Sequence, residues 1–203
     1  MNEEVIYSKN ILEFVTVAKE FCVFVENVKD EIKFDFIDKS QKLLSLLYVK
    51  ASLIPDVNET FEDYTEKFVS ENDWNNIQQQ VAEKLGSHEL FLDVLEPIVQ
   101  YSDDTVSVSL SEIFADIYQD LMNFLTLYRI GTNEQMNDAV WECKNNFEQY
   151  WGPRLLSGLT AIHSILYSNE ELTDDEYVAP KNQEINTDNW IISQRQKDWN
   201  NED

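Results

Sequence analysis

The stretch SLSEIFADIYQDLMNFLTLYRIG, which runs from Ser109 to Gly131, decides the fold of this chain. Ser109 can cap the start of a helix with Glu112 as its capping-box partner, and Gly131 can end that helix. Apolar residues recur between these ends at heptad-like spacing, at Leu110, Ile113, Phe114, Ile117, Leu121, Phe124 and Tyr128. A long helix with such a stripe is typical of antiparallel helix packing.

Similar periodicity on both sides of this helix predicts a helical body. Only 4 Gly and 4 Pro interrupt the 203 residues, and apolar residues recur every three or four positions over long segments. We expect further helices at about 8–28, 36–53, 70–85, 132–151 and 153–167, with a shorter element at 87–95. The predicted class is all-α, an irregular antiparallel helical bundle of about six to seven helices.

Turn and cap residues set the limits of these helices. Pro55 ends the second helix, and an acidic linker follows it. Ser70 can cap the next helix, which Gly86 closes. The pair Thr132 and Gln135 forms a second capping box, and Gly152-Pro153 is expected to break the chain before the last helix.

The bundle is expected to fill residues 1–167 as one domain, with a tail at 168–203. The tail holds ten acidic residues against three basic ones and is rich in Asn and Gln, which favours partial disorder or loose docking. Trp190, Ile191, Ile192 and Trp199 are its large apolar exceptions. They are more typical of a patch anchored on the protein's own body than of a peptide offered to a partner.

Charge and termini limit the partners and the location. The formal net charge of -24 repels phosphate backbones and anionic lipid headgroups, which argues against nucleic-acid and membrane partners. The charge could attract a basic protein surface, or it could serve solubility alone. The acidic start and the lack of a continuous apolar span predict a cytoplasmic protein. Cys22 and Cys143 fall at apolar helix positions and are expected in the core.

Glu112, Asp116 and Asp120 form a ladder of carboxylates at four-residue steps on the long helix. The simplest interpretation is a solvated helix face. The alternatives are a surface for a basic partner or, with ligands from a second segment, a site for Mg²⁺ or Mn²⁺. Candidate second ligands are Glu142, Glu148, Glu62, Asp63 and Glu66.

Two further residues complete the speculative site. Tyr118 could line a cavity beside the ladder, although an aromatic residue at helical spacing is more often core. His163, one position beyond Ile162 on the last helix, is expected to be half-buried and satisfied rather than catalytic. We predict no catalytic residue and no resident cofactor, because phosphate-binding glycine clusters and paired nucleophiles are not visible in the sequence.

Three stretches resemble a known family: LYVKASLIP at 47–55, SEIFADIYQDL at 111–121, and Trp151-Gly152 followed by Ala161-Ile162-His163. They are similar to the bacterial domain-of-unknown-function 5063 family, over roughly residues 8–167. The resemblance implies a helical domain and supplies no catalytic residues.

These observations favour a non-enzymatic interaction or regulatory module with an acidic surface that engages a basic or helical partner. The alternative is a divalent-metal-dependent hydrolase or small-ligand binder that uses Glu112, Asp116 and Asp120, with Tyr118 or His163. The sequence leaves the oligomeric state open.

Overall fold

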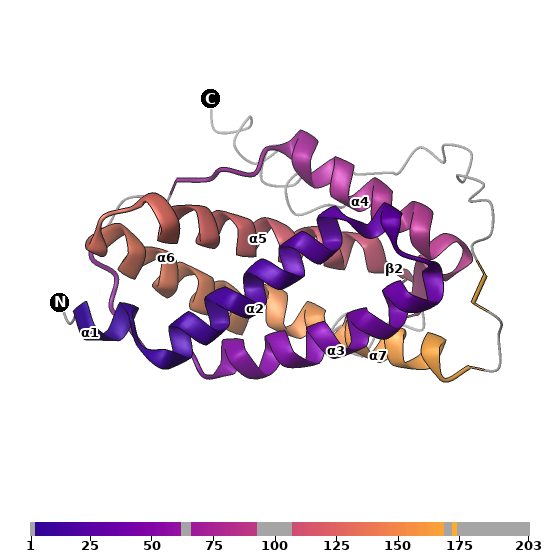
Figure 1. Cartoon of the computed structure of the whole chain (residues 1–203), viewed down its shortest axis with the longest axis horizontal. Helices are drawn as coiled ribbons and strands as arrows, with labels where there is room; N and C mark the ends of the chain where they lie inside the picture. Colours follow the sequence, from indigo (N-terminus) through magenta and orange to yellow (C-terminus); the bar gives the residue numbers. More distant parts are fainter. Residues whose placement is uncertain (1–2, 62–65, 93–106, 169–171, 174–203) are drawn as a thin grey trace, which may run out of the picture.

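Helices account for most of the chain in the computed structural model, which describes residues 3–61, 66–92, 107–168 and 172–173 (Figure 1). The predicted helical class is confirmed. The helices are α1 (Glu3–Ile6), α2 (Lys9–Glu26), α3 (Lys33–Ser52), α4 (Glu71–Leu85), α5 (Leu110–Ile130), α6 (Asn133–Asn146) and α7 (Gly152–Leu166). Short 3-10 turns at Val28–Asp30 and Gly86–His88 follow α2 and α4. Within these ranges no helix is long and apolar enough to cross a membrane.

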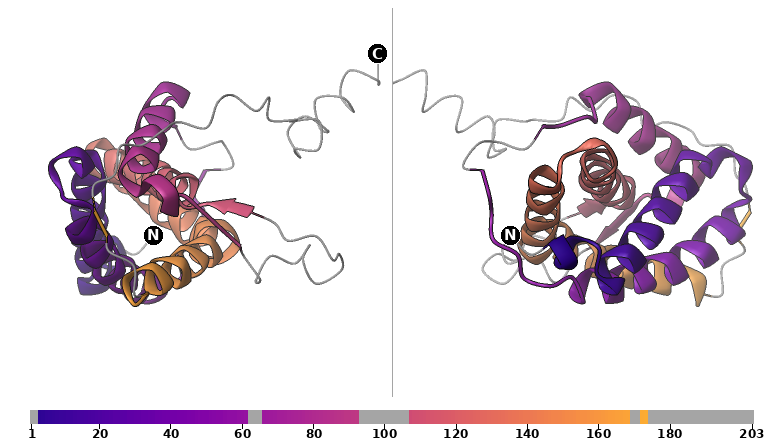
Figure 2. Two further views of the ribbon diagram at one scale, coloured as in Figure 1. Left: turned by 90° about the vertical axis from the view of Figure 1, so that its right-hand side faces the viewer. Right: turned by 60° about the vertical axis from the view of Figure 1, so that its left-hand side comes forward.

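The long helix α5 is the centre of the bundle, because α2, α4, α6 and α7 all pack against it. Its ring Phe114 stacks on Phe21 of α2 at a centroid distance of 5.9 Å and meets Phe36 of α3 at 5.5 Å. The predicted stripe of α5 is buried, apart from Tyr128, which is partly buried. The two views in Figure 2 show α4 lying over α5 at one edge of the bundle.

Local capping chemistry fixes several helix ends as predicted. Ser70 and Asp73 form a reciprocal capping box at the start of α4, and Thr132 and Gln135 form another at the start of α6. Gly86 closes α4 with a φ of 57°, a left-handed conformation that L side chains rarely adopt.

A small antiparallel sheet departs from the all-α expectation between α4 and α5. Strand β1 (Leu90–Leu92) pairs with β2 (Ser107–Ser109), with Phe91 opposite Val108. Three-residue strands are too short for alternation to stand out against the helical pattern, so the sequence does not reveal them.

The expected break at Gly152-Pro153 is wrong, because the backbone stays helical from α6 into α7. A π-helical turn, Phe147–Trp151, joins them. The Gly152 N–H donates to the Phe147 carbonyl oxygen, and a Cβ at position 152 would lie only 2.3 Å from that oxygen. Pro153 falls in the first turn of α7, where the fixed φ of proline is compatible with a helix.

The acidic linker between α3 and α4 is held to the bundle by two buried polar side chains. Asp138 of α6 accepts the backbone N–H groups of Thr60 at 2.7 Å and of Phe61 at 3.0 Å. Asn123 of α5 accepts those at positions 68 and 69. These bonds satisfy backbone N–H groups that would otherwise lack an acceptor where the bundle shields them from water.

Candidate functional site

Asp116, the middle carboxylate of the ladder, lies where α4, α5 and α7 meet. Its side chain is only 12% exposed. Trp74 Nε1 donates to Oδ1 at 3.0 Å, and the Tyr150 hydroxyl donates to Oδ2 at 2.8 Å. Arg154 Nη1 lies 3.0 Å from the same Oδ2. The charge of Asp116 is therefore balanced inside the protein, and we call these four residues the Asp116 cluster.

The π-helical turn and the start of α7 supply two members of this cluster. The Arg154 guanidinium lies over the Tyr150 ring, 4.8 Å from its centroid, as in a cation–π contact. Burial raises the pKa of Tyr150, and the charge of Asp116 raises it further. The Tyr150 hydroxyl therefore keeps its proton and remains a donor to Asp116.

Glu112 sits one turn before Asp116 and is half-buried. Burial raises the pKa of its carboxyl, and the negative charges of Asp116 and Glu89 add to the shift. Ser109 Oγ accepts the Glu112 N–H at 3.1 Å, as predicted. In the described part of the chain, however, the return bond that would complete a capping box at α5 does not form.

Glu89, which was not predicted as a site residue, lies beside the start of α5 and accepts hydrogen bonds from it. Both Ser109 Oγ and Ser111 Oγ donate to Glu89 Oε1, the latter at 2.6 Å. Gln78 Nε2 of α4 donates to Ser111 Oγ at 2.9 Å. Burial raises the pKa of Glu89, although the hydrogen bonds from the two serines act to lower it. This second cluster ties the approach to β1 and the helix α4 to the start of α5.

Asp120, the last ladder carboxylate, lies beside α6. Asn146 Nδ2 donates to its Oδ1 at 2.8 Å. Burial raises the pKa of Asp120 from 3.8 to about 6, although that hydrogen bond and the charge of Lys67 act to lower it. Asp120 and the buried thiol of Cys143 line a cavity of about 10 Å³, which has room for about one water molecule.

Glu112, Asp116 and Asp120 thus share one side of α5, as their spacing predicts, but a fully solvated face is the wrong description of that side. Trp74 of α4, Tyr150 of the π-helical turn and the first turn of α7 cover the middle of the ladder. Helical spacing shows that carboxylates share a face; it does not show which neighbouring helix packs over that face.

The other two predicted site residues lie elsewhere. Tyr118 is buried, and its hydroxyl donates to Glu26 Oε1 of α2 at 2.9 Å. His163 is exposed rather than half-buried; its Nδ1 lies 3.3 Å from Gln41 Nε2, and its ring lies 4.6 Å from that of Tyr167. Across the described ranges, neither residue shares a hydrogen bond with a ladder carboxylate.

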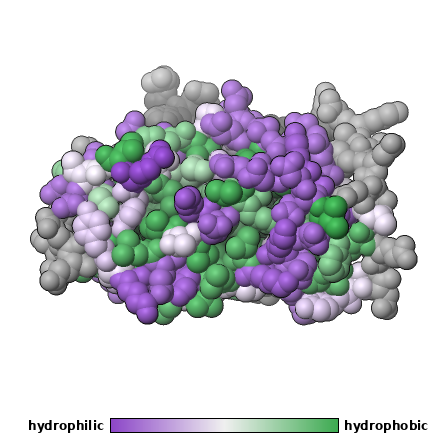
Figure 3. All heavy atoms as spheres, viewed as in Figure 1, coloured by the Kyte–Doolittle hydropathy of each residue, from purple (hydrophilic) through white to green (hydrophobic). Residues whose placement is uncertain are grey.

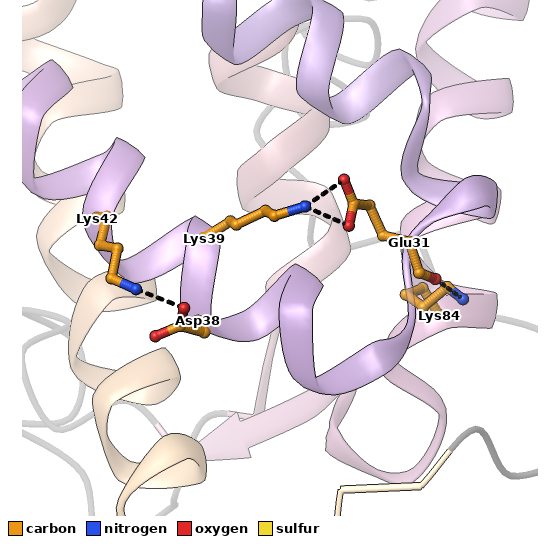
Figure 4. Close-up of polar contacts among 5 residues, drawn as sticks. All are labelled: Glu31, Asp38, Lys39, Lys42 and Lys84. Atoms are coloured by element: carbon orange, nitrogen blue, oxygen red, sulfur yellow. Dashed lines mark hydrogen bonds and ion pairs between the residues drawn. The ribbon is translucent and has the colours of Figure 1, made fainter.

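His163 belongs instead to an open groove between α3 and α7, which we call the α3–α7 groove. It has a volume of about 580 Å³ and is lined by Gln41, Lys42, Ser45, Leu46, Val49, Leu159 and His163. The Lys42 ammonium pairs with Asp38 on the same helix, and Lys39 pairs with Glu31 at 2.6 Å (Figure 4). The cation at the groove is therefore neutralised by its own helix.

Among the described residues, no group of three His, Cys, Asp or Glu side chains lies close enough together to hold a metal ion. Glu142, one candidate ligand, pairs with Lys67 at 2.5 Å. Glu62 and Asp63 lie outside the described residues, as do the tail residues from 174 to 203.

Sequence reasoning missed the partners of Asp116, which are Trp74, Tyr150 and Arg154. It also missed Glu89, the acceptor of the second cluster. Trp74 is 42 residues away from Asp116, and Tyr150 is 34 residues away. A partial signal exists in the run Tyr150-Trp151-Gly152-Pro153-Arg154, where a polar aromatic residue and a cation flank a backbone irregularity. π-Helical turns inside helices are often found at functional sites.

Comparison with known proteins gives a family profile and a solved structure. The profile described as Domain of unknown function (DUF5063) matches residues 5–168. The crystal structure of protein BF1032 from Bacteroides fragilis is 34% identical in sequence, with a TM-score of 0.73, over 82% of this chain and 98% of that one. The search of curated proteins finds no match.

Proposed function

Since this chain belongs to the DUF5063 family, a domain of unknown function, we propose its function from the surface that the bundle leaves open. The bundle is a non-enzymatic interaction module that binds a basic amphipathic helix of a partner protein in the α3–α7 groove. Leu46 and Val49 carry this proposal, because these residues line the groove and are 44% and 52% exposed. Exposed apolar residues rimmed by polar ones are typical of a recognition surface.

The shape of the groove favours a helix as the bound element. Leu46 and Val49 lie three residues apart on α3, and Leu159 faces them from α7. The apolar side of an amphipathic helix offers anchors at the same three- and four-residue spacing. Figure 3 shows the face of the molecule on which α2 and α3 lie in front in Figure 1. On this face apolar residues are interspersed with polar ones.

The charge of the protein favours a basic partner. The net charge of -24 draws cationic proteins toward the surface. Lys42 does not oppose this attraction, since Asp38 neutralises it. The same charge argues against nucleic acid and membrane as partners. We place the module in the cytoplasm, where the free thiols of Cys22 and Cys143 would stay reduced.

This proposal moves the contact away from the carboxylate ladder. Asp116 already accepts hydrogen bonds at both oxygens and faces Arg154. A partner that approached the Asp116 cluster would have to displace these internal contacts. The ladder therefore contributes to the long-range field of the protein, while the α3–α7 groove provides the contact surface.

Two model peptides test the proposal. Both have the same leucine face; one carries Lys on its polar face and the other carries Glu. The measurement is made at about 0.15 M salt, which screens weak electrostatic attraction. We expect only the Lys peptide to shift the NMR methyl signals of Leu46, Val49 and Leu159. Leu46→Asp should abolish these shifts. The matched control is Val23→Asp, at an exposed aliphatic residue on α2. Equal binding of the Lys peptide by Leu46→Asp and Val23→Asp, or methyl shifts centred outside the groove, would contradict the proposal.

A further inference from the structure

We infer that the chain's own segment Asn189–Trp199 occupies the α3–α7 groove and competes there with the partner. This inference rests on the proposed function, because it assigns a second occupant to the same groove. The segment lies outside the residues that the structure describes. Three observations support it: the composition of the segment, the place where the chain leaves α7, and the length of the connection.

The segment offers apolar side chains that match the apolar lining of the groove, Leu46, Val49 and Leu159. It contains Trp190, Ile191, Ile192 and Trp199, four large apolar residues within a mostly polar tail. It carries two cations, Arg195 and Lys197, against one acidic residue, Asp198, whereas the whole chain has a net charge of -24. Apolar anchors with local positive charge are also the features proposed for the external partner, so the segment can substitute for it.

The chain leaves the bundle at the edge of the groove. His163, which lines the groove, lies in the last turn of α7, and the Tyr167 ring packs against it. The Tyr167 hydroxyl donates to Gln41 Oε1 at 3.4 Å, which links the end of α7 to the α3 wall. Further along, Leu172 packs against the bundle. The path of the backbone therefore begins on the side of the molecule where the groove lies.

The connection is long enough for the segment to reach the groove. Twenty residues separate Ser168 from Asn189, and they could span up to about 70 Å when fully extended. The α3 wall from Gln41 to Val49 is only about 12 Å long at the helical rise. A tether of this length gives an effective concentration of order millimolar, so even a weak contact would fill the groove.

A spin label on the full-length protein tests the position of the segment. The label is placed at Ser193→Cys, and Cys22 and Cys143 should stay unlabelled because burial raises the pKa of both thiols. We expect strong paramagnetic broadening of the methyl signals of Leu46 and Val49 and weak broadening of Val23 on α2. Adding Leu46→Asp should relieve the broadening at Val49. Uniform broadening, or broadening centred elsewhere, would overturn the inference.

Competition separates this inference from the proposed function. If the segment fills the groove for 80 to 90% of the time, replacing Trp190 and Trp199 by Ser should tighten binding of the Lys peptide about five- to ten-fold. Unchanged peptide affinity with no broadening would overturn the inference and leave the proposed function standing. Suppose that the broadening is confined to the groove, and that neither the wild-type protein nor the variant with both tryptophans replaced binds the Lys peptide. That result would support the inference and contradict the proposed binding of an external partner.

Discussion

The Tyr150 hydroxyl donates a hydrogen bond to Asp116 Oδ2 at 2.8 Å, from a π-helical turn to the middle of α5. The contact joins the widened turn of the backbone to the middle carboxylate of a ladder whose spacing had suggested a solvated helix face. Because Trp74 and Arg154 complete the same cluster, the buried charge is held by three different elements. The cluster thus fixes how α4 and α7 sit on α5.

Replacing Asp116 by Asn should destabilise the fold. The amide keeps the size of the carboxylate, but it loses the charge that faces Arg154 and presents an NH₂ group to one of the donors. We expect a loss of about 1–3 kcal/mol in the free energy of unfolding, measured by urea denaturation at neutral pH. Since Arg154 is 37% exposed, solvent screens part of the lost attraction. An unchanged unfolding midpoint would show that the cluster contributes nothing to stability.

Gly152→Ala should disturb the π-helical turn. The added methyl group would meet the Phe147 carbonyl oxygen at 2.3 Å, so the backbone must move. We expect a loss of about 2 kcal/mol or more, together with a changed Tyr150 environment in near-ultraviolet circular dichroism. Gly158→Ala on α7 is the matched control. Its Cβ would first meet the side chain of Ile113 at 3.1 Å, and Ala favours the helix by up to about 1 kcal/mol, so its net effect should be small.

The sequence reveals those parts of the fold that depend on short-range chemistry. The N-cap at Ser70, the capping box at Thr132 and the stripe of α5 need residues only three or four positions apart, and all three are confirmed. The turn at Gly152 was misread, because Gly-Pro favours a break in most contexts. Here the missing Cβ allows a π-helical turn, and the proline falls in the first turn of α7.

The candidate site was harder to predict, because its contacts join distant segments. The spacing of Glu112, Asp116 and Asp120 correctly placed them on one side of α5, but their solvent exposure depends on how α4 and α7 pack. His163 and Leu46 belong to one groove only because α3 packs against α7. No local pattern in either helix encodes that pairing. The extent of the domain and the role of the ladder in binding remain predictions.

Asp138→Ala should loosen the linker between α3 and α4. Two backbone N–H groups, at Thr60 and Phe61, would lose their acceptor in a partly buried position. We expect a loss of about 2–3 kcal/mol and faster hydrogen exchange of these two amides, read by NMR. Asp56→Ala in the same linker is the control, because Asp56 is 96% exposed and its surface ion pair with Lys144 contributes little to stability, so both quantities should change much less. Protection that persists at Thr60 would contradict this account of the linker.

Asp120→Asn should stabilise the protein at neutral pH, opposite in sign to Asp116→Asn. The pKa of Asp120 rises from 3.8 to about 6 in the folded state, so the folded protein binds this proton more tightly than the unfolded chain does. The wild-type protein therefore loses stability as the pH rises from about 4 through 6, when the buried carboxyl ionises. The Asn variant avoids this cost, which is up to about 3 kcal/mol for a shift of two pKa units. Its amide oxygen can still accept the hydrogen bond from Asn146.

The pH dependence of the difference between variant and wild type isolates Asp120 from the other carboxyls. Urea unfolding at pH 7.5 should show the full stabilisation by Asp120→Asn, and at pH 4 most of it should disappear, because the wild-type carboxyl is then protonated in the fold. Asp116→Asn should remain destabilising at pH 7.5. If Asp120→Asn destabilises at both pH values, the carboxylate must be favoured by its surroundings in the ionised form, and the burial beside Cys143 would not be the dominant influence on it.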